Sequence, residues 1–255
     1  MTAISSPASL ADTVAVPSAG QRVWSVTRLH FANRFTMIAL PWMIFGFIYL
    51  VNIVIWISIF AAMGKPLEGT QWSGSTFYFY VYFGVAAVQA MNLTFRFAMG
   101  LSATRRDYFL GTVLAFAILG ALITIVCTLL SYVEEWTHGF GMNGHMFSNV
   151  YFGSGPLWQR LFTCFGAFLF CFALGSLAGS AFVRWQANGL YLLGAFVAVL
   201  GVAFIATATL TGSWPAVGQW FLQTRTVGVV AWSLIPTAIA GVAGYFVLRK
   251  APSRA

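Results

Sequence analysis

The sequence predicts an all-α membrane protein with six transmembrane helices and both chain ends in the cytoplasm. Three observations lead to this fold class. Hydrophobic residues make up 60% of the 255 residues and charged residues only 7%, whereas a soluble domain carries about 25% charged residues. Apolar runs of about 20 residues, long enough to cross the hydrocarbon layer as a helix, recur along the chain. The basic residues gather on one side of these runs.

The first 21 residues are mostly small and carry a single charge, Asp12. No basic segment leads directly into an apolar core, so we expect no cleaved signal peptide. Residues 1–21 are therefore predicted to form a disordered cytoplasmic tail.

Residues 22–34 are predicted to form a helix that lies in the cytoplasmic membrane interface. Trp24 and Phe31 recur at helical spacing, with Arg28 and Arg34 interspersed as lipid-surface helices require. The alternative is a simple positive anchor beside the first span.

Six apolar runs qualify as spans. They lie near 36–62, 76–95, 109–133, 160–183, 189–210 and 226–248. The fourth and fifth stay separate because one merged helix would be far too long, and residues 184–188 form a tight turn between them. Residues 22–250 are thus one transmembrane domain, followed by a short cytoplasmic tail at 251–255.

The basic residues fix the orientation. With the amino end inside, ten of the 13 basic residues fall on the cytoplasmic side and three outside, as the positive-inside rule requires. The ten are Arg22, Arg28, Arg34, Arg96, Arg105, Arg106, Arg184, Arg249, Lys250 and Arg254; the three are Lys65, Arg160 and Arg225. Because this charge meets anionic lipid along the membrane boundary and forms no stripe on a soluble domain, nucleic-acid binding is excluded.

The loop between the second and third spans, residues 96–108, is the most charged cytoplasmic loop and mixes charge with apolar side chains. Gly100 permits a backbone turn, and Ser102 or Thr104 can cap a helix that starts at the arginines. A short helix here could press on a cytoplasmic protein. Membrane topology by itself is the alternative reason for its arginines.

Within this loop, Met99-Gly-Leu-Ser-Ala-Thr-Arg-Arg-Asp-Tyr-Phe-Leu-Gly-Thr112 resembles the Gly-x-(Ser/Thr)-Arg-Arg-x-(Tyr/Phe)-Phe-x-Gly signature of type-2 ABC exporter permeases. The chain is similar to that family from about residue 22 to 250, including the interfacial helix, the six spans and a short outer helical segment at 213–222. The outer loop at 134–158 is longer than in many relatives. The resemblance implies that Thr104, Arg105, Arg106 and Asp107 contact an ATPase subunit.

The chain itself is not expected to be an enzyme. A P-loop needs GxxxxGK(S/T), but the two lysines are followed by Pro66 and Ala251. ATP and Mg²⁺ are therefore expected on a separate cytoplasmic ATPase subunit. An intramembrane enzyme is disfavoured because all histidines and acids are predicted outside the hydrocarbon core.

Residues 134–146 contain two His, two Met and two acids, a set that could bind copper or zinc. No motif fixes a ligand geometry, so a wet outer loop or lid is the favoured interpretation and no metal site is assigned. A role in gating substrate stays open.

Polar residues inside the spans are candidates for a translocation path. They are Asn52, Trp56, Gln89 and Asn92. Hydrogen bonding between helices is an equally good reason for their presence.

The resulting hypothesis is an export permease of the cell membrane, expected in the bacterial cytoplasmic membrane. It moves a hydrophobic or amphipathic molecule, such as a drug, lipid or peptide, by alternating access. Six helices enclose little volume, so we expect a dimer of membrane subunits, either a homodimer or a heterodimer. The alternative is a secondary carrier or channel that needs no ATPase, although no internal repeat or intramembrane charge supports it.

Overall fold

The computed structural model of the chain describes residues 18–63, 71–72, 74–139, 141, 144–148 and 155–251. Residues 1–17 of the predicted disordered tail and the last four residues lie outside this part, as do several residues of the 134–158 loop. The prediction of disorder is wrong for residues 19–21, which belong to the first helix. Nearly all described residues are helical. Within this part of the chain, five helices are long and apolar enough to cross a membrane, in agreement with the predicted all-α, multi-pass membrane fold.

These five helical segments match five of the six predicted runs. They are η1 with α2 (Phe35–Ala39 and Leu40–Met63), α5 (Arg105–Trp136), α6 (Leu157–Trp185), α7 (Ala187–Leu210) and α8 (Trp214–Arg249). The remaining run, near 76–95, falls on α3 (Phe77–Gln89), η3 (Ala90–Thr94) and α4 (Phe95–Gly100), which follow one another directly. A short η2 (Gly74–Thr76) precedes α3.

The helix before the first span, α1 (Ala19–His30), begins earlier than predicted and ends earlier. Ser18 and Gln21 form a capping box. The Ser18 hydroxyl accepts a hydrogen bond from the backbone amide of Gln21, and the side-chain oxygen of Gln21 accepts one from the backbone amide of Ser18. Two of the free amides at the start of the helix are satisfied in this way. The chain turns at Phe31 and Ala32 before entering the first span.

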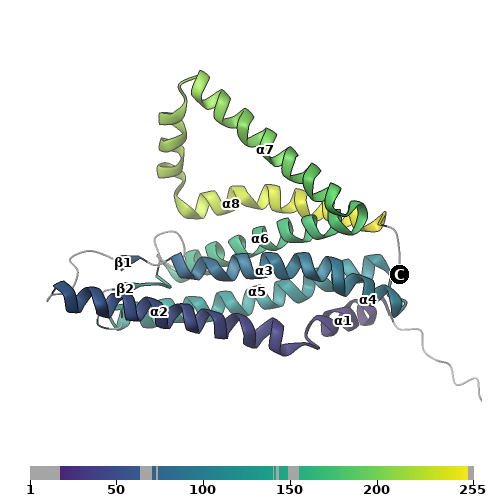
Figure 1. Cartoon of the computed structure of the whole chain (residues 1–255), viewed down its shortest axis with the longest axis horizontal. Coiled ribbons are helices and arrows are strands. Elements are labelled where there is room, and N and C mark those ends of the chain that lie inside the picture. The colour runs from purple at the N-terminus through teal and green to yellow at the C-terminus, as the bar shows by residue number, and fades with distance from the viewer. Residues whose placement is uncertain are drawn as a thin grey trace, which may run out of the picture.

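The helices α3, α5 and α6 form the centre of a bundle, with α2 and α1 along one side (Figure 1). Close approach of α3 and α6 depends on Gly175, where an added Cβ would lie 2.2 Å from the Gly84 carbonyl oxygen. Between α5 and α6, Gly120 leaves room for the Phe168 ring, which an added Cβ would meet at 2.4 Å. Small residues thus let these helices pack tightly.

Two π-helical turns interrupt the bundle, η1 in the first span and η3 after α3. Each presents a carbonyl to a tyrosine from another helix. The Tyr82 hydroxyl donates to Thr36 O at 2.6 Å, and the Tyr108 hydroxyl donates to Ala90 O at 2.5 Å. Such turns often mark functional sites, and here a tyrosine hydroxyl, buried for Tyr108 and partly buried for Tyr82, contacts each one.

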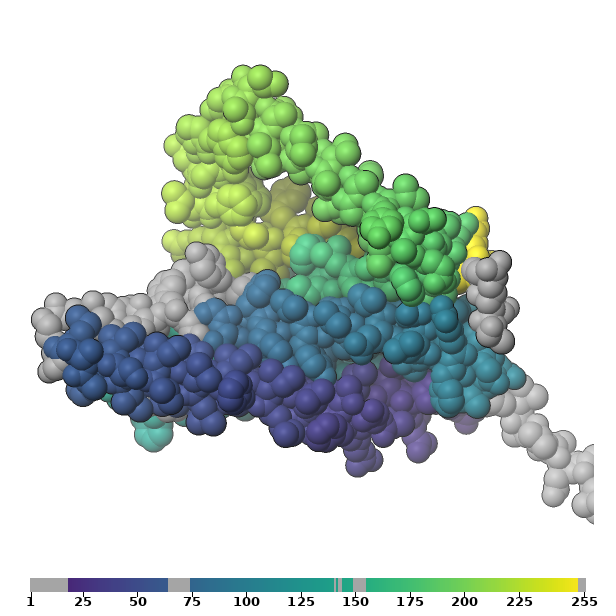
Figure 2. Space-filling model, viewed as in Figure 1, coloured from purple at the N-terminus to yellow at the C-terminus, as the bar shows by residue number. Residues whose placement is uncertain are grey.

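The last part of the chain leaves the bundle. Helix α7 turns back after Gln186, which has a positive φ of 56°, and then diverges from α6 (Figure 1). Arg225 has non-helical angles (φ 53°, ψ 177°) and divides α8 into a short helix at 214–224 and a long helix that returns along α6. We call α7 and residues 214–224 the arm. Figure 2 shows the arm standing away from the bundle, with open space beneath α7.

The two ends of the bundle differ. One end holds α1, the turn between α4 and α5, and the carboxyl end of α8; we call it the α1 end. The opposite end holds two short parallel strands, β1 (Gln71–Trp72) and β2 (Gly144–His145), in which Gln71 pairs with Gly144 and Trp72 with His145. The two ends lie at opposite tips of the long axis in Figure 1.

Candidate functional site

An ion pair joins α1 to the first turn of α5. Arg22 Nε lies 2.8 Å from Asp107 Oδ2, and the Asp107 side chain is only 7% exposed. Thr104 caps α5, because its hydroxyl accepts a hydrogen bond from the Asp107 amide at 3.1 Å. Asp107 therefore lies where the helix dipole favours a negative charge, and its carboxylate is directed at α1.

The same two helices pack closely along α1. The Thr27 hydroxyl lies 3.1 Å from both Val23 O and Gly111 O, so it bonds within α1 and across to α5. Gly111 makes the approach possible, since an added Cβ would lie 2.6 Å from Val26 Cβ. The face of α1 that touches the bundle is thus formed by Val26, Thr27 and His30, which are all buried.

His30 is a buried titratable group in this contact. Thr112 donates its hydroxyl hydrogen to Tyr108 O, so its oxygen can accept from His30 Nε2 at 2.9 Å. In this tautomer Nδ1 is an acceptor, and it is buried without a partner in the described part of the chain. Burial lowers the pKa of His30 from 6.5 to about 4, so the ring is neutral at pH 7.

A cleft of about 310 Å³ opens between α1 and the turn that joins α4 to α5. Its lining is mixed, so it suits an amphipathic partner segment. The apolar lining residues are Val26, Leu29, Ala98, Leu101 and Ala103, and the polar ones are Arg22, Ser25, Ser102 and Asp107. The exposed turn at the mouth contains Ser102, which adopts a positive φ of 60°.

The four residues that the family resemblance implies as ATPase contacts have different roles here. Thr104 and Asp107 make bonds within the protein, as described above. Arg105 donates from Nη1 to Arg249 O at 2.7 Å and so ties α5 to the end of α8. Arg106 is exposed and lines a groove between α5 and α8. The apolar cleft residues beside them were not singled out from the sequence.

The residues predicted for the interfacial helix lie mainly on the outer surface of α1 and the turn after it. Trp24, Arg28 and Arg34 are exposed, and Phe31 is half-buried against the bundle. The sequence argument followed the aromatic stripe. It missed the face of α1 that packs on the bundle. The only sequence signal for that face was the helical spacing of Val26, Thr27 and His30, two of which are polar.

The four predicted path residues do not form one site. Asn52 donates to Ile48 O at 2.8 Å and to the Ser75 hydroxyl at 3.0 Å, and Trp56 is buried nearby on the same helix. Gln89 lies 14 residues beyond Ser75, which is about 21 Å along a helix at 1.5 Å per residue. Gln89 is exposed, whereas Asn92 is half-buried with its Oδ1 unpaired in the described part of the chain.

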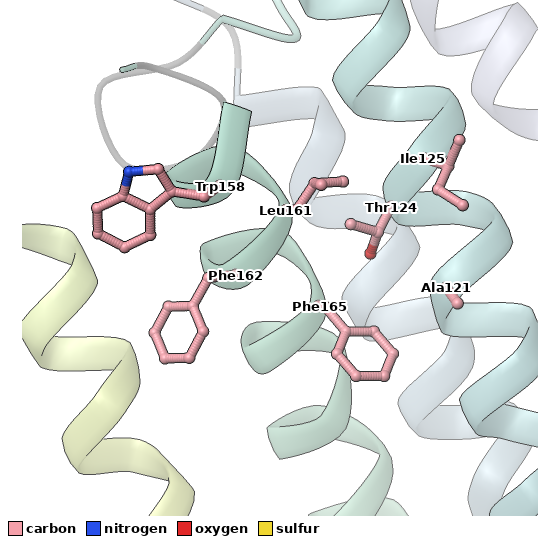
Figure 3. Close-up of a pocket in the computed structure, with 7 residues that line it drawn as sticks. All are labelled: Ala121, Thr124, Ile125, Trp158, Leu161, Phe162 and Phe165. Carbon is pink, nitrogen blue, oxygen red and sulfur yellow. The ribbon is translucent and has the colours of Figure 1, made fainter. Parts of the chain in front are cut away.

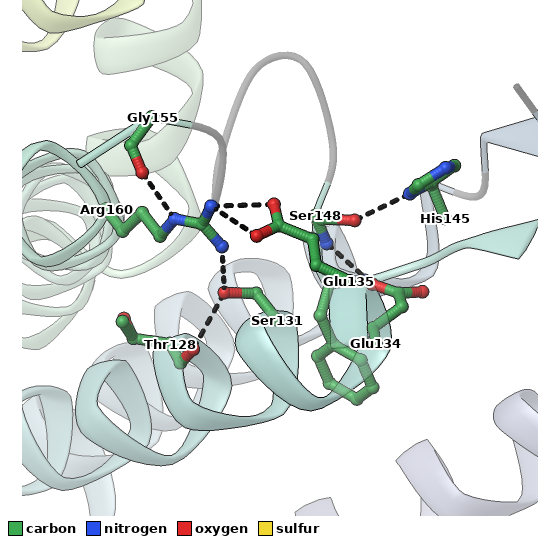
Figure 4. Close-up of polar contacts among 9 residues, drawn as sticks. Thr128, Ser131, Glu134, Glu135, His145, Ser148, Gly155 and Arg160 are labelled. Carbon is green, nitrogen blue, oxygen red and sulfur yellow. Dashed lines mark hydrogen bonds and ion pairs between the residues drawn. The ribbon is translucent and has the colours of Figure 1, made fainter. Parts of the chain in front are cut away.

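The end opposite α1 is held by two buried charged residues, whose contacts are drawn in Figure 4. The fully buried Glu134 carboxylate accepts hydrogen bonds from the amides of Met146, Phe147 and Ser148 at 2.5, 2.8 and 2.7 Å. It thereby fixes the segment that follows β2 to the end of α5. The sequence argument counted Glu134 among the acids of a possible metal set and did not predict these hydrogen bonds.

Arg160, at the start of α6, is the second of these residues and is 4% exposed. Its Nη2 donates to both carboxylate oxygens of Glu135 (2.6 and 2.8 Å), and its Nη1 donates to the Ser131 hydroxyl (Figure 4). The guanidinium carbon also lies 4.2 Å from the centre of the Tyr132 ring. Arg160 Nε also donates a hydrogen bond to Gly155 O at 2.7 Å. Arg160 therefore ties α5 to α6 through hydrogen bonds from all three nitrogens of its guanidinium.

The proposed metal set in residues 134–146 is only partly described, since residues 140, 142 and 143 lie outside the described residues. His145 Nδ1 lies 2.7 Å from the Ser148 hydroxyl. Over the described ranges, no group of three or more His, Cys, Asp or Glu residues is arranged to hold a metal ion.

An apolar pocket of about 420 Å³ opens between α5 and α6 (Figure 3). It is lined by Ala121, Thr124, Ile125, Trp158, Leu161, Phe162 and Phe165. None of these side chains is titratable. The pocket can hold an apolar molecule, and none of the lining side chains is a general base.

No family model matches the chain, and comparisons with curated proteins and with solved structures give no match.

Proposed function

We propose that the chain is the membrane-spanning permease subunit of an ATP-driven exporter of the type-2 ABC class. A separate cytoplasmic ATPase subunit, which binds ATP and Mg²⁺, docks at the α1 end. The observation that carries the proposal is the cleft between α1 and the α4–α5 turn, because it joins two elements that the family resemblance singles out. The chain itself catalyses no reaction.

The proposed topology has six spans, with the α1 end in the cytoplasm of a bacterial cell. The second span is formed by α3, η3 and α4, which contain 13, 5 and 6 residues. Their 24 residues extend about 36 Å at 1.5 Å per residue, longer than a hydrocarbon core of about 30 Å. The α1 end also carries most of the described basic residues, in keeping with the positive-inside rule.

In the proposed coupling step, an apolar side chain of the ATPase occupies the cleft beside Leu101. Movement of the ATPase then displaces α1 and the turn together. The Arg22–Asp107 ion pair passes this displacement to α5, and the bond from Arg105 to Arg249 O passes it to α8. The tyrosine contacts at η1 and η3 offer points where the first two spans can bend.

The proposed complex contains two membrane subunits, either two copies of this chain or this chain and a homologue. The arm supports this assembly, because it leaves almost all of α7 uncovered in a single chain. The cargo is a hydrophobic or amphipathic molecule such as a drug, lipid or peptide. The apolar lining of the pocket between α5 and α6 suits such a cargo.

The experiment that tests this function is co-expression of the full chain with candidate ATPases, followed by measurement of ATP hydrolysis by the purified complex. Leu101→Asp places a charge in the cleft and is expected to abolish co-purification. Leu210→Asp is the control, since Leu210 is 87% exposed at the tip of the arm. Unchanged assembly and hydrolysis with Leu101→Asp would refute docking at the cleft.

A charge exchange tests the coupling step. Arg22→Asp by itself is expected to uncouple ATP hydrolysis from transport. Arg22→Asp combined with Asp107→Arg is expected to restore part of this coupling. Transport that continues at full rate without any ATPase would instead establish a secondary carrier.

A further inference from the structure

A groove of about 430 Å³ runs along the outside of the bundle between α5 and α8. Its walls are apolar: Phe109 and Leu110 come from α5, and Gly241, Val242 and Phe246 come from α8. The rings of Phe109 and Tyr245 meet edge to face, with centroids 5.4 Å apart, and join the two helices. The side chains of Leu110, Val242 and Phe246 remain largely exposed, so the groove opens to the side.

One end of the groove is strongly basic. Arg106 lines it, and Arg105, Arg249 and Lys250 lie beside it, because Arg105 is bonded to Arg249 O. Among the described residues, Asp107 is the one acidic residue at the α1 end, and its buried carboxylate is paired with Arg22. Glu134 and Glu135 lie at the far end of the bundle. Within the described part of the chain, Arg106 therefore makes no ion pair.

A long apolar groove that ends in an arginine matches the shape and charge of one kind of molecule. We propose that this groove binds an anionic phospholipid, with an acyl chain against Leu110, Gly241 and Phe246 and the phosphate at Arg106. A guanidinium recognises a phosphate by paired hydrogen bonds. This site goes beyond the export function proposed above and does not depend on it.

Charge complementarity favours this occupant over a second copy of the chain. A two-fold related copy presents the same surface to the groove, so it would bring a second set of arginines against the first. Like charges in contact oppose association, whereas an anionic headgroup neutralises the cluster. A zwitterionic lipid carries its own cation and fits the cluster less well.

The test is native mass spectrometry of the full chain purified in detergent, without an ATPase. Phosphatidylglycerol and phosphatidylcholine with identical acyl chains are added at equal concentration. We expect one phosphatidylglycerol to be retained per chain and phosphatidylcholine to be retained at least tenfold less. Equal retention of both lipids would overturn the headgroup assignment.

Two substitutions probe the two parts of the site separately. Arg106→Gln removes the charged phosphate contact and is expected to weaken phosphatidylglycerol binding about tenfold, the low end of what charge-assisted hydrogen bonds contribute. Gly241→Leu fills the groove. An added Cβ at Gly241 has no atom within 4 Å, so the helices need not move, and we expect lipid retention to be lost.

Matched controls exclude a general effect of charge or bulk. Arg96→Gln removes an exposed arginine of the same end, and Gly201→Leu adds the same side chain to α7 where an added Cβ also has no atom within 4 Å. Both should retain phosphatidylglycerol, and all four variants should melt within a few degrees of the parent. The proposal fails if Arg106→Gln and Gly241→Leu bind the lipid like the parent.

Three further outcomes would also overturn it. These are competition by millimolar inorganic phosphate, loss of a lipid-free dimer on Gly241→Leu, and retention lost equally in the controls. Because no ATPase is present, a negative result leaves the export function untouched.

Discussion

The bundle and the arm are built from similarly apolar helices, yet they are buried to very different extents. In the most apolar stretches of α5 and α6, 44% of the residues are buried, against 6% in α7. Lipid is as apolar as leucine, so hydrophobicity does not drive helices together inside a membrane. The difference therefore comes from packing of small residues and from internal hydrogen bonds.

Glycine illustrates the difference. In the bundle, an added Cβ at Gly120, Gly166 or Gly175 would meet another atom at 2.4 Å or less. In the arm, an added Cβ at Gly194 or Gly201 meets nothing within 4 Å. The same residue type is a contact site in one region and open surface in the other. The arm is thus free to meet lipid or another subunit.

The largest expected effect concerns Glu134, the buried carboxylate that accepts hydrogen bonds from three backbone amides. Glu134→Ala removes the acceptor of three buried amides, and we expect the free energy of unfolding to fall by about 4 kcal/mol. Gln219→Ala, an exposed change in the arm, should alter it by less than about 0.5 kcal/mol. Unfolding of the purified protein in mixed micelles measures both. A loss below about 1 kcal/mol for Glu134→Ala would contradict the description of this end as a fixed structure.

Acidification should weaken the α1 end of the bundle. The pKa of His30 is lowered by burial to about 4, whereas an unfolded histidine titrates near 6.5. Between these values the unfolded state binds a proton that the folded state excludes, so stability falls as pH decreases from about 6.5 to about 4. The full effect is about 3 kcal/mol.

The measurement is the free energy of unfolding as a function of pH, for the parent and for His30→Gln. The glutamine keeps a hydrogen-bond donor but does not titrate. We expect the variant to lose most of the dependence of the unfolding free energy on pH in this window. An unchanged dependence would show that groups other than His30 cause it.

Replacing a glycine by alanine should lower the stability of the protein moderately in the bundle but not in the arm. Gly120→Ala forces the added Cβ against the Phe168 ring and should destabilise the protein by about 2 kcal/mol. Gly201→Ala, in the arm, should be neutral or slightly stabilising because alanine favours helix. Thermal melting of both variants provides the comparison, and equal melting temperatures would show that the bundle is no more tightly packed than the arm.

The smallest expected effect is the loss of a single hydroxyl. Tyr108→Phe removes the hydrogen bond to Ala90 O in η3 and should cost about 1 kcal/mol. Tyr191→Phe, at a position 74% exposed on α7, should have no measurable effect. Hydrogen exchange at the amides around η3 adds a local readout. If exchange there stays unchanged in Tyr108→Phe, the hydroxyl does not hold the π-helical turn.

The sequence predicted much of the helical plan and little of the candidate site. Five of the predicted runs match long apolar helices, because crossing a membrane requires a length of apolar chain that is visible in the residues themselves. The division of the last helix at Arg225 agrees with the short helical segment expected at 213–222. The same method could not identify the packing face of α1, because its buried residues include the polar Thr27 and His30, whereas the large aromatic Trp24 is exposed.

By itself, the sequence determined the membrane class, the approximate helix positions and the concentration of positive charge near α1 and the α4–α5 turn. These properties depend on local composition, which each segment carries wherever it lies. Only the tertiary structure paired Arg22 with Asp107, enclosed Glu134 in three amides and set Arg106 at the end of a groove. Each of these contacts joins residues distant along the chain or needs a fixed loop geometry, so no local pattern encodes it.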